Sequence, residues 1–345
     1  MARFFLTAVF LLSWPLPSAE LAPDFTAVDT LIQKWVDAGY YPSAGIWIVS
    51  KEGKTLHERY WGGATRTSPF MVASASKWLE AATMMTLVDE GELNLDKPIS
   101  NYLPEMKGPL GRNTLRQIFS HTSSLNSVVF DKSAGAASYP SRIILGQPTV
   151  GPGELFAYGG VDLVIGWNAV ERVTGSPWLF TFAKKVAGPL AMKDTVTGDD
   201  LYVYQHMVGG DIFPRSTAAD YMNFLLMLLN EGVYQGHRVL SVAAIREMEA
   251  DEVRGARVNR PEYPESTLAQ THHGVYGLGE WRFYPDDKGN AEVLTSPSFA
   301  GFIPWIDKRL GIAAVFAGRA TGGIDAFHAS AQLMKLTREA FDDSP

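Results

Sequence analysis

A serine and a lysine three residues apart are the side chains of this sequence best suited to do chemistry. Ser74 and Lys77 lie in the stretch MVASASKWLEAATMMTLVDEG, residues 71–91, whose apolar residues recur at helical spacing. Three residues make nearly one helical turn, so the Lys77 amine can reach the Ser74 hydroxyl. A lysine desolvated by Ala81 and Met84 can accept a proton as the free amine. The pair therefore predicts a serine nucleophile that is activated by a lysine.

The same spacing also has a purely structural explanation. Ser74 could act only as a helix N-cap, and Lys77 could pair with Glu80 on a solvent-exposed helix face. If the serine is catalytic, we expect it at the helix N-terminus, where free N–H groups and the macrodipole favour negative charge. Four letters are weak evidence, so the surrounding sequence has to decide between these explanations.

Composition excludes several classes of protein. The chain has 345 residues, 46% of them hydrophobic, which suits a large folded core. Thirty Lys and Arg against 37 Asp and Glu give a formal charge of -7. No basic run or Arg/aromatic stripe is present, so nucleic acid is not an expected partner. The sequence has no cysteine, which excludes disulfides, thiolate zinc sites, a cysteine nucleophile and a lipoprotein anchor.

The first residues have the pattern of an export signal. Arg3 precedes an apolar stretch from Phe4 to Leu16, and a Pro/Ser/Ala-rich region follows. We expect a signal peptide at residues 1–19 with cleavage near Ala19, and hence a periplasmic or secreted bacterial protein without a stable membrane span. The apolar stretch at residues 221–232 is too short to cross a bilayer and predicts a buried core helix.

Both ends of the chain contain strand-forming segments, whereas the middle is mostly helical. Residues 43–63 read as a β-hairpin, and residues 275–318 as three or four strands with turns at 286–289 and 308–311. Helices are predicted at about 24–38 and 324–341. The middle is mostly helical, with one helix ending at Gly175 and another beginning with a capping-box pattern at Thr217 and Asp220.

These elements predict an α+β fold. Strands from both ends join most simply into one antiparallel sheet, flanked by the two terminal helices. We expect a discontinuous sheet domain formed by residues 24–73 and 266–345, and a mostly helical domain at residues 74–265 inserted into it. A ligand site is expected where the two domains meet.

Several motifs in the same order resemble one known family. SASKWLEAATMMTLVDEGELNLDKPISNYLPE (74–105), LRQIFSHTSSL (115–125) and PGELFAYGGVDLVIGWNAVERVTG (152–175) carry the resemblance, and GPLAMKDT and STAADYMNFLLMLLNEG match further recurrent pieces. The chain resembles the serine β-lactamase-like hydrolases, the group of class C β-lactamases, D-alanyl-D-alanine carboxypeptidases and family VIII carboxylesterases. The resemblance covers nearly the whole mature chain and implies a β-lactamase/transpeptidase-like fold.

The family's second motif, Tyr-x-Asn, falls on Tyr158, Gly159 and Gly160. The resemblance implies that Tyr158 shares proton transfer with Lys77, and a phenol beside an ammonium group is chemically suited to this. Gly160 stands in place of the usual Asn, so the amide that would hold a substrate's acyl-amide group is missing.

The third motif, Lys-Thr-Gly or His-x-Gly in the family, aligns with Ser296-Pro297-Ser298, with Phe299 next. A register shifted by two residues, Ser298-Phe299-Ala300, is the alternative. Neither contains a lysine, so there is no fixed cation for the carboxylate that β-lactams and D-Ala-D-Ala peptides carry. In the first register the resemblance implies an oxyanion hole made by the N–H groups of Ser74 and Phe299.

The predicted function is a serine carboxylesterase with a broad, short-acyl preference. Ser74 would form an acyl-enzyme with Lys77 and Tyr158 as general base, and no metal or organic cofactor is needed. A β-lactamase or D-alanyl-D-alanine carboxypeptidase is the alternative enzyme. A catalytically weak protein that binds cell-wall peptides or a partner is the alternative from another class. The expected partner is a small ester or amide, and the sequence predicts no particular oligomeric state. Four aromatic residues are candidates to line the pocket or to pack in the core: Trp281, Phe299, Phe302 and Trp305.

Overall fold

A six-stranded antiparallel sheet is built from both ends of the chain. The computed structural model describes residues 22–127, 129–130, 144–145, 148–159, 161–197, 214–258 and 275–342. The sheet order is β11-β12-β13-β14-β1-β2. The strands are β1 (Ala44–Ser50), β2 (Thr55–Trp61), β11 (Trp281–Pro285), β12 (Ala291–Thr295), β13 (Phe302–Asp307) and β14 (Ile312–Gly318). The predicted hairpin and the predicted C-terminal strands are confirmed.

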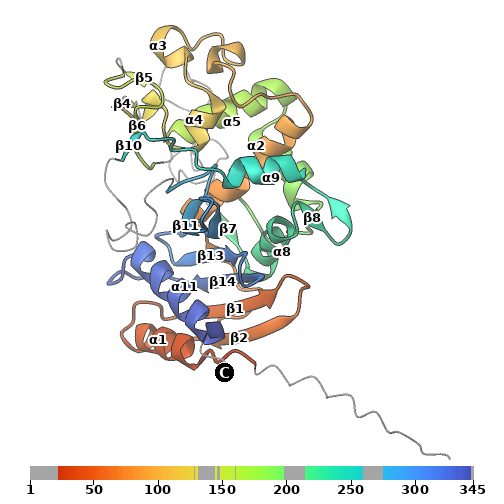
Figure 1. Cartoon of the computed structure of the whole chain (residues 1–345), viewed down its shortest axis with the longest axis vertical. Coiled ribbons are helices and arrows are strands. Elements are labelled where there is room, and N and C mark those ends of the chain that lie inside the picture. The colour runs from red at the N-terminus through yellow and green to blue at the C-terminus, as the bar shows by residue number, and fades with distance from the viewer. Residues whose placement is uncertain are drawn as a thin grey trace, which may run out of the picture.

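The pairing of β1 with β14 joins the two ends. Ile46 lies opposite Phe316 in this antiparallel register. Ile46 and Phe316 belong to an apolar core on one face of the sheet, which helices α1 (Thr26–Asp37) and α11 (Ala326–Asp342) cover (Figure 1). Ile32 on α1 and Leu333 on α11 are fully buried in that core. Burial of these apolar side chains is the main driving force for docking the terminal helices on the sheet.

The opposite face of the sheet packs on a second apolar core that belongs to the helical part. Val315 of β14 and Phe224 of helix α8 (Ala218–Leu229) are both buried there. Residues 221–229 lie in this core helix, as predicted. Within the described residues, no helix is long and apolar enough to cross a membrane.

The helical part lies above the sheet in Figure 1 and surrounds α2 (Ser76–Asp89). Its other helices are α3 (Gly108–Gly111), α4 (Leu115–Phe119), α5 (Val161–Thr174), α6 (Trp178–Phe182) and α9 (Val242–Glu249), with a π-helical turn at Ala183–Ala187 and 3₁₀ turns at Ala73–Ala75, Ile99–Asn101 and Ser124–Ser127. In the described part of this region there are also four two-residue strand pairs: β3 (Phe70–Met71) with β7 (Arg215–Ser216), β4 (Val129–Phe130) with β5 (Ile144–Leu145), β6 (Leu155–Phe156) with β10 (Arg257–Val258), and β8 (Val233–Tyr234) with β9 (His237–Arg238). The exact domain boundaries stay a prediction.

Gly175 and Thr217 have the helix-end geometry that their residue types predict. Gly175 adopts φ +65° directly after α5, where a left-handed residue ends the helix at low cost. The Thr217 hydroxyl accepts the N–H of Asp220 at 3.0 Å and caps α8. The Asp220 carboxylate does not complete a capping box, because it accepts the N–H of Asp194 at 2.7 Å instead.

Candidate active site

Ser74 lies in a tight turn at the entrance to α2. Strand β3 leads into this turn, and the N–H of Val72 donates to the carbonyl of Pro214 at 3.1 Å. Ala73 has φ +33°, a strained value for a residue with a side chain. The α-helix itself begins at Ser76, so Ser74 lies in the 3₁₀ turn just before it, and neither this turn nor α2 has a side-chain cap. Ser74 is partly exposed, as a nucleophile must be.

Lys77 is buried and contacts the serine. Its Nζ donates a hydrogen bond of 3.2 Å to Ser74 Oγ, and the residue is 1% exposed. The same Nζ lies 4.8 Å from the centre of the Tyr158 ring. The structure thus brings together the three residues predicted to be catalytic. Because α2 is buried on every side from Ser76 to Leu87, the structural explanation that placed Lys77 on a wet face does not apply.

Tyr158 comes from the segment between β6 and α5. Its hydroxyl oxygen is buried, and aromatic side chains surround its ring. The ring centre lies 4.9 Å from that of His121, 5.0 Å from that of Trp281 and 5.9 Å from that of Tyr276. Gly160, the position where the family has Asn, lies outside the described residues. These ring contacts fix the plane of the phenol beside Lys77.

The segment predicted to hold the third motif follows β12. The single O–H of Ser296 lies between two main-chain carbonyls, that of Ser74 at 3.1 Å and that of Gly279 at 3.1 Å, which share it as acceptors. The Ser298 hydroxyl accepts the N–H of Ala300 at 3.0 Å. Both serine side chains are fully buried, so they hold the backbone of the site. Ser296 thus contacts the main chain of Ser74, the predicted nucleophile, and the register of the third motif stays a prediction.

The four aromatic candidates for the pocket divide into two groups. Phe299 is 66% exposed, next to Ser298. Trp281, Phe302 and Trp305 are buried, so they belong to the core of the sheet rather than to an open binding surface.

Glu80 is a buried carboxyl group, whereas the alternative explanation of the Ser74 and Lys77 spacing would have it on a solvent-exposed face. It is completely buried one turn beyond Lys77 on α2, and Trp167 Nε1 donates to its Oε2 at 3.2 Å. Burial raises the pKa of Glu80 to about 7, and the charge of Lys77 opposes that rise. An acidic residue at i+3 from Lys77 was visible in the sequence, but its burial depends on the packing of α5 against α2.

His121 and Asp162 form a second buried polar pair, next to Tyr158. His121 Nδ1 lies 3.4 Å from Asp162 Oδ1, and both side chains are fully buried. The Ser123 hydroxyl donates to Asp162 Oδ2 at 3.2 Å. Burial lowers the pKa of His121 and favours the neutral imidazole. The His121 ring contacts the Tyr158 ring edge-on.

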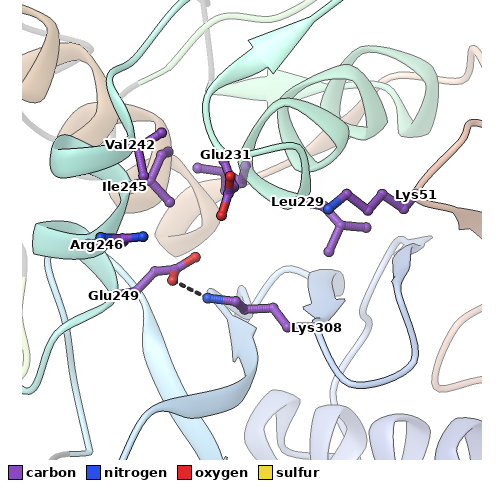
Figure 2. Close-up of a pocket in the computed structure, with 9 residues that line it drawn as sticks. Lys51, Leu229, Glu231, Val242, Ile245, Arg246, Glu249 and Lys308 are labelled. Atoms are coloured by element: carbon purple, nitrogen blue, oxygen red, sulfur yellow. Dashed lines mark hydrogen bonds and ion pairs between the residues drawn. The ribbon is translucent and has the colours of Figure 1, made fainter.

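Other polar groups gather away from Ser74. Figure 2 shows a hollow of about 150 Å³ near the ends of α8 and α9, where the Lys308 ammonium pairs with the Glu249 carboxylate. Its lining includes none of the predicted site residues. Across the described ranges, no group of three or more His, Asp and Glu side chains is placed to hold a metal ion.

The comparisons with known proteins agree with this geometry. The β-lactamase family model matches residues 28–317. A solved structure from Bacteroides dorei with a β-lactamase description is 33% identical and has a TM-score of 0.83, covering 93% of this chain and 100% of that one. An uncharacterized protein from Mycobacterium tuberculosis, MT1414, is 29% identical over 70% of this chain and 72% of its own length. Esterase EstB from Burkholderia gladioli is 29% identical over 43% of this chain and 45% of its own length. With the family model spanning most of its length, this chain belongs to the β-lactamase family of serine hydrolases.

Proposed function

We propose that the protein is a carboxylesterase that works through an acyl-enzyme on Ser74. The observation that carries this proposal is the hydrogen bond of 3.2 Å between the buried Lys77 Nζ and Ser74 Oγ. A buried amine beside a hydroxyl is placed to take its proton, because burial disfavours the ammonium form. Tyr158, with its ring 4.8 Å from the same Nζ, completes the group.

The reaction has two steps with balanced proton transfers. Lys77, as the free amine, takes the Ser74 proton while Ser74 Oγ bonds to the ester carbonyl carbon. The alkoxy group then leaves and receives a proton from the Lys77 and Tyr158 pair. In the second step water attacks the acyl-enzyme, its proton passes to the same pair, and the carboxylic acid leaves with Ser74 restored. The N–H groups of Ser74 and Phe299 are proposed to stabilise the oxyanion in both steps.

The choice of esters over β-lactams rests on the segment after β12. Ser296, Pro297 and Ser298 include no cation, whereas β-lactams and D-Ala-D-Ala peptides present a carboxylate. The relative EstB is described as an esterase, which supports the same choice. A broad preference for short acyl groups stays part of the proposal, as does a periplasmic or secreted location in a bacterium.

Hydrolysis of 4-nitrophenyl butyrate by the mature protein tests the proposal. Release of 4-nitrophenolate by the parent and its loss in Ser74→Ala, purified in the same way, is the expected result. A fluorophosphonate probe should label the parent at Ser74 and leave the variant unlabelled. Equal rates for the two proteins would contradict the proposal. Absence of labelling in the parent would favour the alternative of a catalytically weak binding protein.

A β-lactamase is the second candidate, because the family model and the Bacteroides dorei structure carry that description. Hydrolysis of nitrocefin measured beside the butyrate ester separates the two. A kcat/KM for the cephalosporin well above that for the ester would reverse the order of the candidates.

A further inference from the structure

An apolar hollow is lined by parts of the segments that precede Ser74 and follow Ser298. It has a volume of about 770 Å³, within the roughly 300–1,000 Å³ typical of small-molecule sites. Its apolar lining includes Pro69, Phe70, Met71, Phe299, Ala320 and Ile324. Arg319 contributes the one charged side chain among the residues that line it. Phe299, the exposed aromatic residue that follows Ser298, therefore forms part of a concave surface.

Two segments connect the hollow with Ser74. Met71 ends β3 three residues before the nucleophile, so its Cα lies at most about 11 Å from that of Ser74 along the chain. On the other side, Phe299 is three residues after Ser296, whose hydroxyl contacts the Ser74 carbonyl at 3.1 Å. The hollow thus begins at the two segments proposed to supply the nucleophile and the oxyanion hole.

The remaining walls come from the end of the sheet. Ser43 precedes β1, and Gly318 ends β14. The N–H of Ala320 donates to the carbonyl of Ala300 at 2.9 Å, and the N–H of Arg319 donates to that of Ser43 at 3.0 Å. These backbone hydrogen bonds tie the walls to the sheet, so the hollow is part of the rigid scaffold and exists without a ligand.

We infer that this hollow binds the acyl chain of the substrate and that the enzyme accepts medium-length apolar acyl groups of about six to ten carbons. This inference rests on the proposed esterase function and replaces its preference for short acyl groups with a preference for medium-length ones. The acyl group stays bonded to Ser74 through both steps, whereas the alcohol must escape after the first. A surface that begins at the segments next to Ser74 therefore suits the acyl group through the whole cycle. Each buried CH₂ group adds apolar area removed from water.

The test is the dependence of kcat/KM on acyl length for 4-nitrophenyl esters from acetate to dodecanoate. In the parent, kcat/KM should rise about two- to fourfold per CH₂ up to about eight carbons. Ala320→Trp fills the hollow without removing a hydrogen bond of the Ala320 backbone. It should lower kcat/KM for the octanoate at least tenfold and leave the acetate within about twofold.

Matched variants keep the test decisive. Ala243→Trp adds the same side chain to an exposed position on α9, in a different hollow, and should keep the parent profile. Ile324→Ala widens the apolar hollow and should move the best substrate to a longer chain. Far-UV circular dichroism and thermal melting check that each variant is folded.

The outcomes separate this inference from the proposed function. Hydrolysis of the short esters with a flat length profile, the same in Ala320→Trp and Ala243→Trp, overturns the inference and leaves the esterase in place. A rate that depends only on the alcohol length of alkyl acetates assigns the hollow to the leaving group and also overturns it. Sedimentation changed by Ala320→Trp with an unchanged profile would assign the surface to a second copy of the chain. No hydrolysis of any ester by the parent refutes the proposed function itself.

Discussion

The Ser296 hydroxyl donates a hydrogen bond of 3.1 Å to the main-chain carbonyl of Ser74, across 222 residues of sequence. The same hydroxyl reaches the carbonyl of Gly279 at 3.1 Å. One side chain thus ties the turn that carries the nucleophile to the segments before β11 and after β12. We expect this contact to help position Ser74 relative to the sheet.

Removing that hydroxyl tests its role in positioning Ser74. In Ser296→Ala we expect kcat for 4-nitrophenyl butyrate to fall about ten- to a hundredfold, because a small displacement of the nucleophile is costly. Stability should fall by about 1 kcal/mol in urea unfolding. Ser330→Ala on α11 removes another buried hydroxyl, which donates to the carbonyl of Phe327 at 2.8 Å, and should keep the parent kcat. Equal kcat values for the two variants would show that Ser296 has no positioning role.

Lys77→Met should remove most of the esterase activity and leave the protein folded. The methionine side chain fills the same buried space but accepts no proton, so kcat should fall about 10²- to 10⁴-fold. Stability should be unchanged or higher, because a lysine side chain is costly to bury whether it keeps or loses its proton. Lys54→Met, at an exposed position between β1 and β2, is the control and should match the parent in both assays. Retained turnover in Lys77→Met would rule out the lysine as the base.

Tyr158→Phe separates the chemistry of the phenol from the packing of its ring. The ring contacts with His121 and Trp281 remain, so the melting temperature should change by no more than a few degrees. Loss of the hydroxyl should lower kcat about ten- to a thousandfold. Tyr158→Leu should lower both kcat and stability. A kcat for Tyr158→Phe equal to that of the parent would limit the tyrosine to a packing role.

Glu80 should give the protein a pH-dependent stability. Because burial raises the pKa of Glu80 from 4.5 to about 7, the folded state holds the proton that the unfolded state releases. This contribution is present below about pH 4.5 and is lost as pH rises through 7. Glu80→Gln keeps an oxygen that accepts the N–H of Trp167 Nε1, and its amide is neutral at both pH 5 and pH 8. The free energy of unfolding of the variant, relative to that of the parent, should therefore be higher at pH 8 than at pH 5 by on the order of 2 kcal/mol.

Urea unfolding at pH 5 and pH 8 measures the Glu80 effect. Glu92→Gln, at an exposed position, is the control and should keep the pH dependence of the parent. If Glu80→Gln and Glu92→Gln behave alike, Glu80 is ionised in the folded protein at both pH values.

Gly279 allows α2 to approach the sheet closely. It has φ +89°, and a Cβ there would lie 2.5 Å from the carbonyl oxygen of Lys77 and 2.8 Å from the Cβ of Ala81. Gly279→Ala should push α2 away, with a loss of about 2–4 kcal/mol in stability and of at least tenfold in kcat. Gly289→Ala has a similar φ of +81° with open space around its Cβ, so it measures the backbone strain alone. Thermal melting and kcat of the two variants should differ clearly.

Sequence alone determined the local elements of this protein and predicted the chemistry of the Ser74 and Lys77 pair. Apolar periodicity is a property of neighbouring residues, so it identified α2, α5 and the strands from both ends, and the spacing of Ser74 and Lys77 followed from helical geometry. The resemblance of several ordered motifs added Tyr158, which lies 81 positions along the chain from Lys77.

Only the tertiary structure decided which polar and aromatic side chains are buried. Glu80 is inside because α5 places Trp167 against it, and Phe299 is exposed while Phe302 and Trp305 are in the core. The contact of Ser296 with Ser74, and the hollow that begins between Met71 and Phe299, join segments from distant parts of the sequence. Burial and such contacts arise from the packing of whole elements, and no local pattern of residues encodes them.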